Sequence, residues 1–576
     1  HGPETKGEAM PIPMNRGAFA QAGSSLAFKT GSWRSIKPVH LHATAPCHGA
    51  CPAGEDQQAW LALLQEGHAR QAWESLVAAN PLPAITGRVC PHPCENACNR
   101  GQYDAPVAIH GIERWLGDEA IRNDWAYSRL PGAPRPERVA VVGAGPAGLS
   151  AAYHLTRRNF NVVLLDSLPE PGGLLRSAIP PTRLPRSVID AEIGRLLTMG
   201  IEFRPRATLG RDLTLDELRS EFDAVFLGIG AGKSRHWDVN GAVPADLHEG
   251  LGLLREWLAV GAIPKPNAVV IHGGGNTAVD LARVMRRAGV RDVHVVTASG
   301  LPGPDTEPDD VLNVVPRELE QAVEEGVQFH PHRTINRLIM RGSKVVGVEM
   351  VRLKKLPDGS GRKSRIAFEG TETVLHVDMV VPAIGEVVEP AGLEGILRRK
   401  DFIAADPFGR VDGQAGLFAG GDCRDWIKGH PGGTVSAAIG DGRRAAEGID
   451  ALLSGRTTVD GRRPPLPYQS LNLAYYERAP RVDPPTLALA ERDDTREIEG
   501  GPTAAQALAE AQRCFSCGNC LACDNCWTLC PDNAVLKTSE TARDGSHYLF
   551  DYDYCKGCGL CAKECPCGFI AMVADE

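Results

Sequence analysis

Long hydrophobic runs and an excess of positive charge are both missing from this sequence of 576 residues. No stretch of 18 uninterrupted apolar residues occurs, and the first residues show no charged segment followed by an apolar one. The sequence therefore predicts no transmembrane segment and no secretory leader. The net charge of −9 argues against nucleic acid as a partner. We expect a soluble, cytoplasmic protein.

The composition also lacks the signs of a disordered or fibrous chain. Hydrophobic residues make up 43%, with 63 glycines and 43 prolines, which is typical of a globular, loop-rich protein. Disulfide scaffolds are short secreted chains, whereas this chain is long and its 17 cysteines gather toward its two ends. We therefore expect the cysteines to bind metal in a reducing compartment.

The most specific motif is a doubled cysteine run near the C-terminus. The segment Cys520-Leu-Ala-Cys523-Asp-Asn-Cys526-Trp-Thr-Leu-Cys530-Pro531 recurs as Cys555-Lys-Gly-Cys558-Gly-Leu-Cys561-Ala-Lys-Glu-Cys565-Pro566. Three closely spaced cysteines wrap one corner of an iron–sulfur cube, and in a two-cluster ferredoxin the fourth cysteine reaches the other cube. We therefore predict two [4Fe–4S] clusters with interleaved ligands: Cys520, Cys523, Cys526 and Cys565 for one, and Cys555, Cys558, Cys561 and Cys530 for the other.

Zinc and disulfides are the alternatives at this run. A zinc site needs one tetrahedral set of four ligands, which two interleaved sets ending in Cys-Pro fit less well. Cys514 and Cys517 have the same two-residue spacing and leave open a shifted register of Cys517, Cys520 and Cys523. Cys423 and Cys567 have no partners at ligand spacing, so we predict that they are buried thiols.

Two glycine-rich loops predict nucleotide sites. The first, Gly143-Ala-Gly145-Pro146-Ala147-Gly148, follows a predicted strand at 138–142 and precedes a helix. Its glycines permit a tight turn, approach of the backbone to a pyrophosphate and close packing of helix on strand. Asp166 ends the next strand about 20 residues on, where a carboxylate binds ribose. The alternative is a purely structural glycine-rich turn.

The second loop, Gly273-Gly-Gly275-Asn276-Thr277-Ala278, follows a predicted strand at 268–271. Two loops imply two nucleotides, and a redox protein with clusters needs a converter between two-electron and one-electron steps. FAD at the first loop and a nicotinamide at the second is the natural division. The next strand ends at Thr297 without an acid or an arginine, which leaves NAD and NADP open, although the missing cation favours NADH. A loop that no longer binds dinucleotide is the alternative.

The order of these segments resembles the glutamate synthase small-subunit family and the N-terminal half of dihydropyrimidine dehydrogenase, over about residues 45–455. The matching segments are Cys47-x3-Cys51-Pro, 87–98, 143–148, 171–175, 273–278, 383–385 and 419–422. The resemblance implies FAD at the first loop and NAD(P)H at the second. It also implies flavin contacts from three more segments: Gly172, Gly173, Leu174 and Leu175; Gly421 and Asp422; and the helix that begins near Thr434 and Val435.

This sequence departs from the family at two places. NADPH-using members commonly carry a Tyr-Arg-Arg-like segment where this chain has Thr297-Ala298-Ser299, which strengthens NADH over NADPH. The family's N-terminal domain usually binds two [4Fe–4S] clusters through eight positions, whereas five cysteines are present here: Cys47, Cys51, Cys90, Cys94 and Cys98.

We prefer one N-terminal cluster on Cys51, Cys90 and Cys94. Its fourth ligand stays open between Cys98, Cys47 and Glu113, and the glutamate is included because related proteins use a side-chain oxygen from this segment. A second cube completed by Cys47, Cys98 and either His40 or His42 also stays open. So do zinc binding and simple packing of the thiols.

We thus expect a multidomain α/β protein with an N-terminal α-helical Fe–S domain, two Rossmann-like nucleotide-binding domains for FAD and NAD(P), and a C-terminal ferredoxin-like 2[4Fe–4S] domain. The expected segments are an N-terminal arm (1–45), the helical domain (46–130), a first FAD-binding segment (138–260), the NAD(P)H-binding domain (261–380), a second FAD-binding segment (381–455), a linker and helix (456–513) and the ferredoxin domain (514–576).

The expected function is electron transfer in a hetero-oligomer. FAD would exchange hydride with NAD(H) and single electrons with the clusters, so we predict no catalytic acid–base residue. The expected partner is soluble ferredoxin or a catalytic subunit, such as a 2-oxoacid:ferredoxin, aldehyde or benzoyl-CoA type oxidoreductase. Two alternatives stay open: an NADPH-dependent glutamate synthase small subunit, and an electron-conducting scaffold with a vestigial nicotinamide site.

Overall fold

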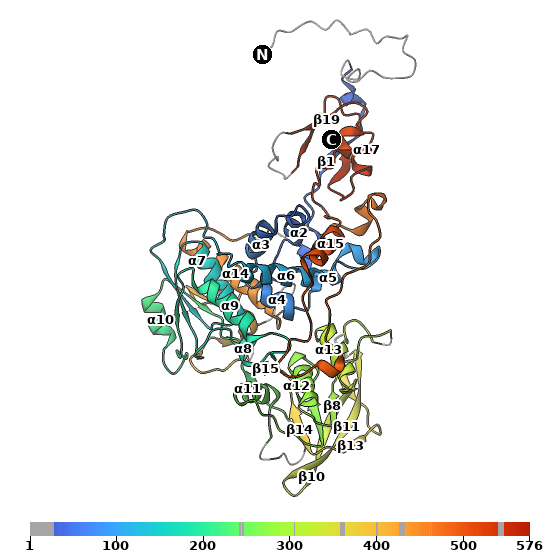
Figure 1. Ribbon diagram of the computed structural model, residues 1–576. Coiled ribbons are helices and arrows are strands. Elements are labelled where there is room, and N and C mark those ends of the chain that lie inside the picture. Colours follow the sequence, from blue (N-terminus) through green and yellow to red (C-terminus); the bar gives the residue numbers. More distant parts are fainter. Residues whose placement is uncertain are drawn as a thin grey trace.

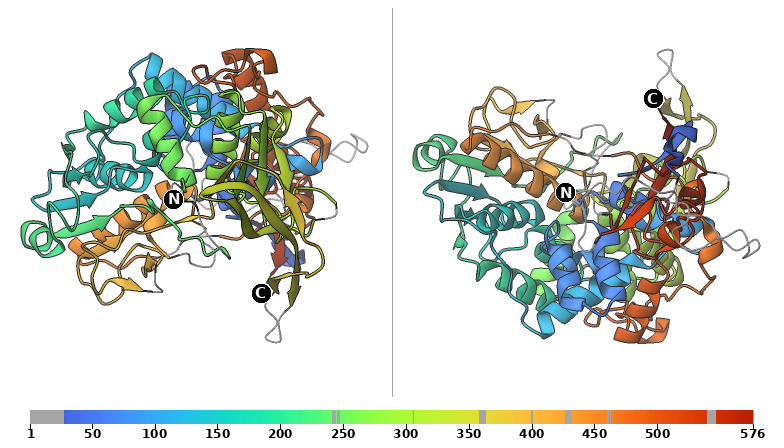
Figure 2. Two further views of the ribbon diagram at one scale, coloured as in Figure 1. Left: turned by 90° about the horizontal axis from the view of Figure 1, so that it is seen from below. Right: turned by 90° about the horizontal axis from the view of Figure 1, so that it is seen from above.

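The computed structural model describes residues 28–240, 244, 247–304, 306–357, 363–398, 401–425, 432–459, 461, 463–538 and 546–575. A helical domain occupies the centre, between the first α/β domain at its side, the second α/β domain below it and a small C-terminal domain above it (Figure 1). Seen from below, the two α/β domains lie side by side (Figure 2). These four bodies agree with the fold class that the sequence predicts.

The helical domain packs around buried tryptophans. Trp60 and Trp73 are fully buried in its core. Its helices cross closely at glycines, because a Cβ on Gly117 would overlap the backbone of Ala84. Its described helices are α1 (Pro46–Ala50), α2 (Gln57–Gln65), α3 (Ala69–Val77), α4 (Pro83–Val89), α5 (Pro93–Asn96) and α6 (Ile109–Arg122), with the 3-10 turn η4 (Asn99–Gln102). The earlier 3-10 turn η3 (Thr30–Trp33) lies at the C-terminal domain, where Gly31 N donates to Asp553 O at 2.8 Å.

The first α/β domain contains a parallel sheet of order β18-β5-β2-β3-β4. Strand β18 begins almost 200 residues after the end of β5. The domain is therefore built from two separate segments of the sequence. The strands are β2 (Arg138–Val142), β3 (Asn161–Leu165), β4 (Glu202–Arg204), β5 (Ala224–Leu227) and β18 (Leu417–Ala419). The helices are α7 (Pro146–Arg157), α8 (Leu174–Ser177), α9 (Arg186–Leu197), α10 (Leu215–Glu221) and α14 (Val435–Leu453), with the turn η5 (Gly421–Cys423) and the small strand pair β16 (Leu397–Arg398) and β17 (Phe402–Ile403).

The second α/β domain contains a parallel sheet of order β14-β7-β8-β9, covered on one face by an antiparallel sheet. The parallel strands are β7 (Ala268–His272), β8 (Asp292–Val296), β9 (Gln328–His330) and β14 (Met379–Pro382). The antiparallel strands are β10 (Arg333–Arg341), β11 (Lys344–Pro357), β12 (Lys363–Ala367) and β13 (Thr373–Leu375). The helices are α11 (Gly250–Val260), α12 (Asn276–Arg287) and α13 (Pro316–Glu324).

The expected border between these domains, at residue 260, places helix α11 in the first domain. Helix α11 packs its Leu253, Leu254 and Trp257 into the core of the second domain, so the border falls before this helix. The two connections between the domains run beside each other, because β6 (Lys233–Ser234) pairs antiparallel with β15 (Glu386–Val387).

The two ends of the described chain meet in the C-terminal domain. Strand β1 (Ile36–His40), from the predicted arm, pairs antiparallel with β21 (Ile570–Ala574). Residues 1–27 of that arm lie outside the described residues. The other elements of the domain are α16 (Asn525–Thr528), β19 (Val535–Lys537), β20 (Tyr548–Phe550) and α17 (Leu560–Lys563).

Residues 463–518, which include most of the expected linker and helix, form a strap that packs into the helical domain. Leu466 and Leu471 enter the helical core, and Arg481 Nη2 donates to Glu95 Oε2 at 2.7 Å. The strap contains the turns η6 (Tyr468–Ser470), η7 (Leu473–Tyr475) and η8 (Leu489–Glu491) and the helix α15 (Ala504–Gln512). Within the portion of the chain that the structure describes, no helix is both long enough and apolar enough to cross a membrane.

We expect Gly442→Ala to destabilise the first α/β domain. Helix α14 lies so close to α7 that a Cβ at this position would overlap Ala147 O, and overpacking of this kind costs about 1–3 kcal/mol. The matched control is Gly194→Ala on α9, where no atom of the described residues lies within 4 Å of the added Cβ. The control should gain up to about 1 kcal/mol from helix propensity. Thermal unfolding compares the two variants, and equal melting temperatures would contradict the close packing.

Candidate cofactor sites

The first glycine loop is shaped for a pyrophosphate. Gly143 has φ +102°, and a Cβ there would overlap Gly228 O. A Cβ on Gly148 would overlap Gly143 O, so the turn closes only with glycine at both positions. Gly145 caps α7, whose first residues are Pro146 and Ala147, and no atom of the described residues lies within 4 Å of a Cβ built on it. The helix N-terminus is therefore open to an anion.

Asp166 lies at this loop, as its place at the end of β3 predicts. Its Oδ2 accepts from Ala144 N at 2.5 Å and its Oδ1 from Leu168 N at 2.7 Å. Burial raises the pKa of this carboxyl group. Parallel pairing of β2 with β3 brings the acid and the loop to the same edge of the sheet, which is where a ribose carboxylate belongs.

The Gly172–Leu175 segment lies against the same loop. Gly172 N donates to Ala144 O at 2.8 Å, and a Cβ on Gly173 would lie 2.9 Å from Gly145 Cα. Leu174 begins α8, and Leu175 is buried in the domain core.

The third predicted contact region lies across the sheet edge. Gly421 N donates to Asp441 Oδ2 at 3.0 Å, and Asp422 Oδ1 accepts from Gly433 N at 3.2 Å. Thr434 Oγ1 caps α14 by accepting from Ala437 N, and Val435 is the first residue of this helix. The structure thus brings all the predicted FAD-binding segments to one place.

The second loop repeats the construction of the first. Gly273 has φ +136° with Ala383 O beside it, and Gly275 caps α12 with its Cβ direction open among the described residues. Asn276 Oδ1 accepts from Val315 N at 3.1 Å. Thr277 Oγ1 donates to Glu386 Oε1 at 3.2 Å, and Ala278 is buried.

The sequence motif missed one cation near the second loop. Arg365 Nη2, from β12, donates to Ser299 Oγ at 2.9 Å and pairs with Asp310 Oδ1 at 2.6 Å. The same carboxylate faces His332 Nδ1 at 3.4 Å. No local signal could have indicated this arginine, because it lies far from the glycine loop in the sequence.

Three N-terminal thiols lie close to the first α/β domain. Cys90 Sγ is 3.3 Å from Ser436 Oγ, in the first turn of α14. Burial, with the nearby charge of Glu113, raises the pKa of Cys90 to about 12. The pKa of Cys94 is raised by burial and by the charges of Cys51 and Cys90, which indicates that the three thiols are neighbours.

Glu113 lies beside these thiols in a buried polar cluster. Its Oε1 accepts from Thr86 Oγ1 and from Asn80 Nδ2, and its Oε2 is 2.9 Å from His92 Nε2. Burial raises its pKa to about 8. Glu55, which the sequence did not single out, accepts from the same asparagine at 2.8 Å and is also buried.

Cys47 and Cys98 form a different group, together with Cys514 and Cys517 from the end of the strap. Cys47 and Cys517 belong to the helical-domain core, and Cys98 and Cys514 pack against it. Cys517 is therefore grouped with these cysteines, which argues against the shifted register in which Cys517, Cys520 and Cys523 bind one cluster.

The suggested histidines do not complete this group. His40 lies in β1 and stacks on Phe569 of the C-terminal domain, and His42 also faces that ring. No local pattern indicated this position, because β1 reaches the C-terminal domain only through tertiary pairing.

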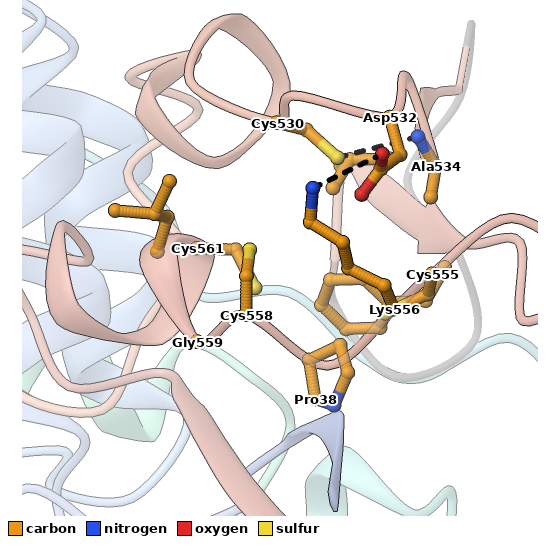
Figure 3. Close-up of a pocket in the computed structure, with 12 residues that line it drawn as sticks. Pro38, Cys530, Asp532, Ala534, Cys555, Lys556, Cys558, Gly559 and Cys561 are labelled. Carbon is orange, nitrogen blue, oxygen red and sulfur yellow. Dashed lines mark hydrogen bonds and ion pairs between the residues drawn. The ribbon is translucent and has the colours of Figure 1, made fainter. Parts of the chain in front are cut away.

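The C-terminal cysteines surround two hollows in the predicted combinations. One hollow is lined by Cys530, Cys555, Cys558 and Cys561. Figure 3 shows Cys530 facing Cys558 and Cys561 across it, with Lys556 reaching toward Asp532. A second hollow is lined by Cys520, Cys523, Cys526 and Cys565.

The two halves of this domain repeat each other in detail. Ala534 N donates to Cys530 Sγ, and Phe569 N donates to Cys565 Sγ, both at 3.3 Å. Cys567 lines the second hollow as a buried fifth thiol, and Cys423 is buried behind the first α/β sheet. Within the described residues, no three His, Cys, Asp or Glu side chains are spaced for a single metal ion. The four-thiol sets that line the two hollows fit iron–sulfur cubes.

Three protein-family models match separate parts of this chain. The model of the pyridine nucleotide-disulphide oxidoreductases matches residues 137–442, which contain both glycine loops and make up more than half of the chain. The chain belongs to this family. Residues 41–125 match dihydropyrimidine dehydrogenase domain II, 4Fe-4S cluster, and residues 548–571 match a 4Fe-4S binding domain.

Curated relatives extend the match over most of the chain. The β subunit of NADP(+)-dependent formate dehydrogenase from Moorella thermoacetica is 32% identical over 87% of this chain and 73% of its own length. The β subunit of NADPH-Fe(3+) oxidoreductase from Geobacter sulfurreducens is 32% identical over 85% and 78%. The glutamate synthase [NADPH] small chain of Escherichia coli is 34% identical over 70% and 87%.

The predicted resemblance to the glutamate synthase small-subunit family is therefore confirmed, as is the fold class. The chain is an iron–sulfur flavoprotein oxidoreductase of the NAD(P)H-dependent type. Its loops and thiol groups fit FAD, a pyridine nucleotide and [4Fe–4S] clusters.

We expect Gly145→Val and Gly275→Val to separate the two nucleotide sites. A Cβ at either position points into open space at a helix N-terminus, with no described atom beyond its chain neighbours within 4 Å, so the fold should survive. Gly145→Val should purify with less than about a tenth of the wild-type FAD, because the backbone can no longer approach the pyrophosphate. Gly275→Val should keep its FAD and lose reduction by nicotinamide about 100-fold. Flavin absorbance and anaerobic reduction measure both, and FAD loss in the second variant alone would reverse the assignment.

Proposed function

We propose that this chain is the electron-transfer subunit of a larger oxidoreductase. When bound, FAD exchanges hydride with NAD(H) and single electrons with the iron–sulfur clusters, which carry them to or from a partner. The observation that carries the proposal is the 3.3 Å contact between Cys90 Sγ and Ser436 Oγ. It joins a candidate cluster ligand to the helix whose N-terminus faces the candidate flavin site.

The Cys90 loop is held by both α/β domains, which supports this role. Ser436 approaches the thiol from the first domain, while Arg317 of α13 in the second domain donates to Arg88 O at 2.7 Å and to Cys90 O at 3.4 Å. An electron carrier bound at this loop would thus be positioned relative to both nucleotide sites. No acid–base side chain is required for hydride transfer, since the protein contributes position and electrostatics.

The flavin-side cluster is proposed to have Cys51, Cys90, Cys94 and Glu113 as ligands. The charge of Glu113 contributes to the raised pKa of all three thiols, which supports its position next to each of them. Iron–sulfur clusters prefer thiolates, so a carboxylate at one corner would give this cluster distinct electronic properties.

We expect Glu113→Ala to remove or degrade one cluster, with a loss of up to about four iron atoms per chain. Glu55→Ala is the matched control, because it removes a second buried carboxyl group that also bonds Asn80. Iron analysis and electron paramagnetic resonance of the reduced protein measure the result. If the iron content of Glu113→Ala is unchanged and Glu55→Ala loses a cluster, the ligand is Glu55 and not Glu113.

The outlet to the partner is proposed to be the C-terminal domain. Cys523 and Cys558 are the exposed thiols of the two C-terminal sets. Leu521, Trp527 and Leu529 are large exposed hydrophobic side chains in the same segment, and an apolar surface beside a redox centre supports docking of another protein. Suitable partners are a catalytic oxidoreductase subunit, as the names of the formate dehydrogenase and iron(III) oxidoreductase relatives suggest, or a soluble ferredoxin.

A glutamate synthase small subunit is the second candidate function. The match to the glutamate synthase small chain covers 70% of this chain, whereas the match to the formate dehydrogenase β subunit covers 87%. Glutamate formation with a large amidotransferase subunit would favour this second candidate.

NADH is the proposed nicotinamide, although the three relatives above are named for NADP(H). The loop after β8 presents Thr297, Ala298 and Ser299, none of which is cationic. Arg365, the cation that contacts this loop, is paired with Asp310 at 2.6 Å. The buried carboxylate would repel a 2′-phosphate, so the arginine is not free to bind one.

We expect anaerobic NADH to bleach the flavin and then reduce the clusters, with kcat/KM at least about tenfold above that of NADPH. Dithionite provides full reduction as a reference. If dithionite bleaches the flavin and neither nicotinamide does, the chain is an electron-conducting scaffold. A preference for NADPH in the wild type would overturn the choice of NADH.

Two neighbouring variants test the reason for this preference. Asp310→Asn releases Arg365 and should raise kcat/KM for NADPH about tenfold, with little change for NADH. Asp309→Asn is the control, because it removes the same charge from an exposed residue that pairs with Lys355 at 2.9 Å, away from the arginine. Equal effects of the two variants would show that net charge alone decides.

A further inference from the structure

Four thiols lie together between the helical domain and the end of the strap. The sequence did not predict these four as the ligands of one cluster. They are Cys47 and Cys517, which belong to the helical-domain core, and Cys98 and Cys514, which pack against it. The pKa of Cys47 is raised by burial and by the negative charges of the other three, which requires them to be close. The pKa of Cys517 is raised to about 12 by burial and by the charges of Cys514 and Cys98.

Hydrogen bonds from the helical domain hold the strap in this position. Gln65 Nε2 donates to Ala511 O at 2.7 Å, just before the two strap cysteines. Asn99 Nδ2, next to Cys98, donates to Cys517 Sγ at 3.6 Å. Hydrogen bonds to cluster sulfurs are one of the means by which proteins set cluster potentials. The strap thiols therefore meet the N-terminal thiols through specific contacts.

The Cys514–Cys517 loop has the backbone of a cluster-binding loop. Ser516 lies two residues after its cysteine with φ +50°, and its N–H donates to Cys514 Sγ at 3.3 Å. A positive φ is uncommon for residues other than glycine. His92 repeats this arrangement with φ +48° and a 3.3 Å bond to Cys90 Sγ. In the C-terminal motif, Ala522 and Gly557 hold the same place after their cysteines, with φ +50° and +75°.

Two short helices divide their cysteines between this group and the flavin-side set. Helix α1 has Cys47 near its start and Cys51 at its end, and α5 has Cys94 near its start and is followed closely by Cys98. The two helices contact each other. Cys51 and Cys94 belong to the flavin-side set, so the second set lies directly behind it.

The group also borders the C-terminal domain. Gly518 N donates to Cys567 O at 2.7 Å, at the hollow lined by Cys565. Tyr476 lies between the two sites, since its hydroxyl donates to Phe515 O at 2.8 Å. Its pKa is raised by burial and by the charges of Cys567 and Cys517, one thiol from each side.

We propose that Cys47, Cys98, Cys514 and Cys517 ligate a further [4Fe–4S] cluster, the link between the flavin-side cluster and the C-terminal pair. Four gathered thiols, two of them on a loop built like those of the C-terminal cluster motif, match the ligand set of a cube. This cluster would accept one electron from the flavin-side cluster and give one to the C-terminal domain, with no bond made and no proton moved. Its role as a link rests on the proposed function, whereas its existence does not.

Iron and acid-labile sulfide counting on the full chain, purified and reconstituted without oxygen, tests the proposal. Four clusters predict about 16 iron and 16 sulfide per chain, whereas three predict about 12. The double variant Cys514→Ala/Cys517→Ala should fall to about 12 of each, with one reduced-cluster signal lost from the electron paramagnetic resonance spectrum. Cys423→Ser is the matched control, because this buried thiol lies in the core behind the first α/β sheet and should retain about 16.

The outcomes separate this proposal from the proposed function. About 12 irons in the wild type, zinc in place of iron, or an unchanged count in the double variant would each overturn the extra cluster. The wild-type count decides even if the double variant fails to fold. Failure of NADH to bleach the wild-type flavin would leave the count intact and reject only the electron-transfer role. Conversely, a double variant whose flavin is bleached while its C-terminal clusters stay oxidised would support the link.

Discussion

Close packing of helix α14 is the contact on which the other sites depend. Two glycines on this helix allow the close contact because they have no side chain. A Cβ on Gly442 would overlap Ala147 O of the first nucleotide loop, and a Cβ on Gly440 would overlap Pro52 O of the helical domain. The same helix begins at Thr434 and carries Ser436, which contacts Cys90. One rigid element thus positions a nucleotide loop and a candidate cluster ligand together, and a shift of the helix would move both.

The remaining domains are oriented by buried charges and by the ends of the chain. Arg183 of the first α/β domain pairs with Asp280 and Glu318 of the second, at 2.7 and 3.0 Å, in a buried network. Such pairs add little net stability, but an unpaired buried charge is costly, which disfavours other orientations of the domains. At the other end of the molecule, pairing of β1 with β21 ties the chain's first described strand to its last.

Motifs with fixed local spacing were predictable from the sequence. The interleaved C-terminal cysteine sets each surround one hollow, and Asp166 lies at the loop that its place after β3 predicts. The prediction was less complete where ligands come from distant segments. His40 and His42 were candidates for a second N-terminal cube, yet they lie against Phe569, and no local pattern pointed to Arg365 near the second loop. One signal in the sequence pointed to the fourth cluster. Cys47 and Cys98 needed two more ligands, and Cys514 and Cys517 were a pair of cysteines that needed two more.

The sequence by itself determined the chemistry of the individual sites: glycines where a backbone must approach a phosphate, and cysteines at intervals that wrap a cube. Those features depend on residues a few positions apart, whose geometry the local backbone fixes. Only the tertiary structure decided which segments are neighbours. It brought Cys514 and Cys517 to Cys47 and Cys98, and α11 to the second domain, because burial of apolar side chains such as Trp60, Trp73 and Trp257 is satisfied by any segment that fits, however distant in the chain.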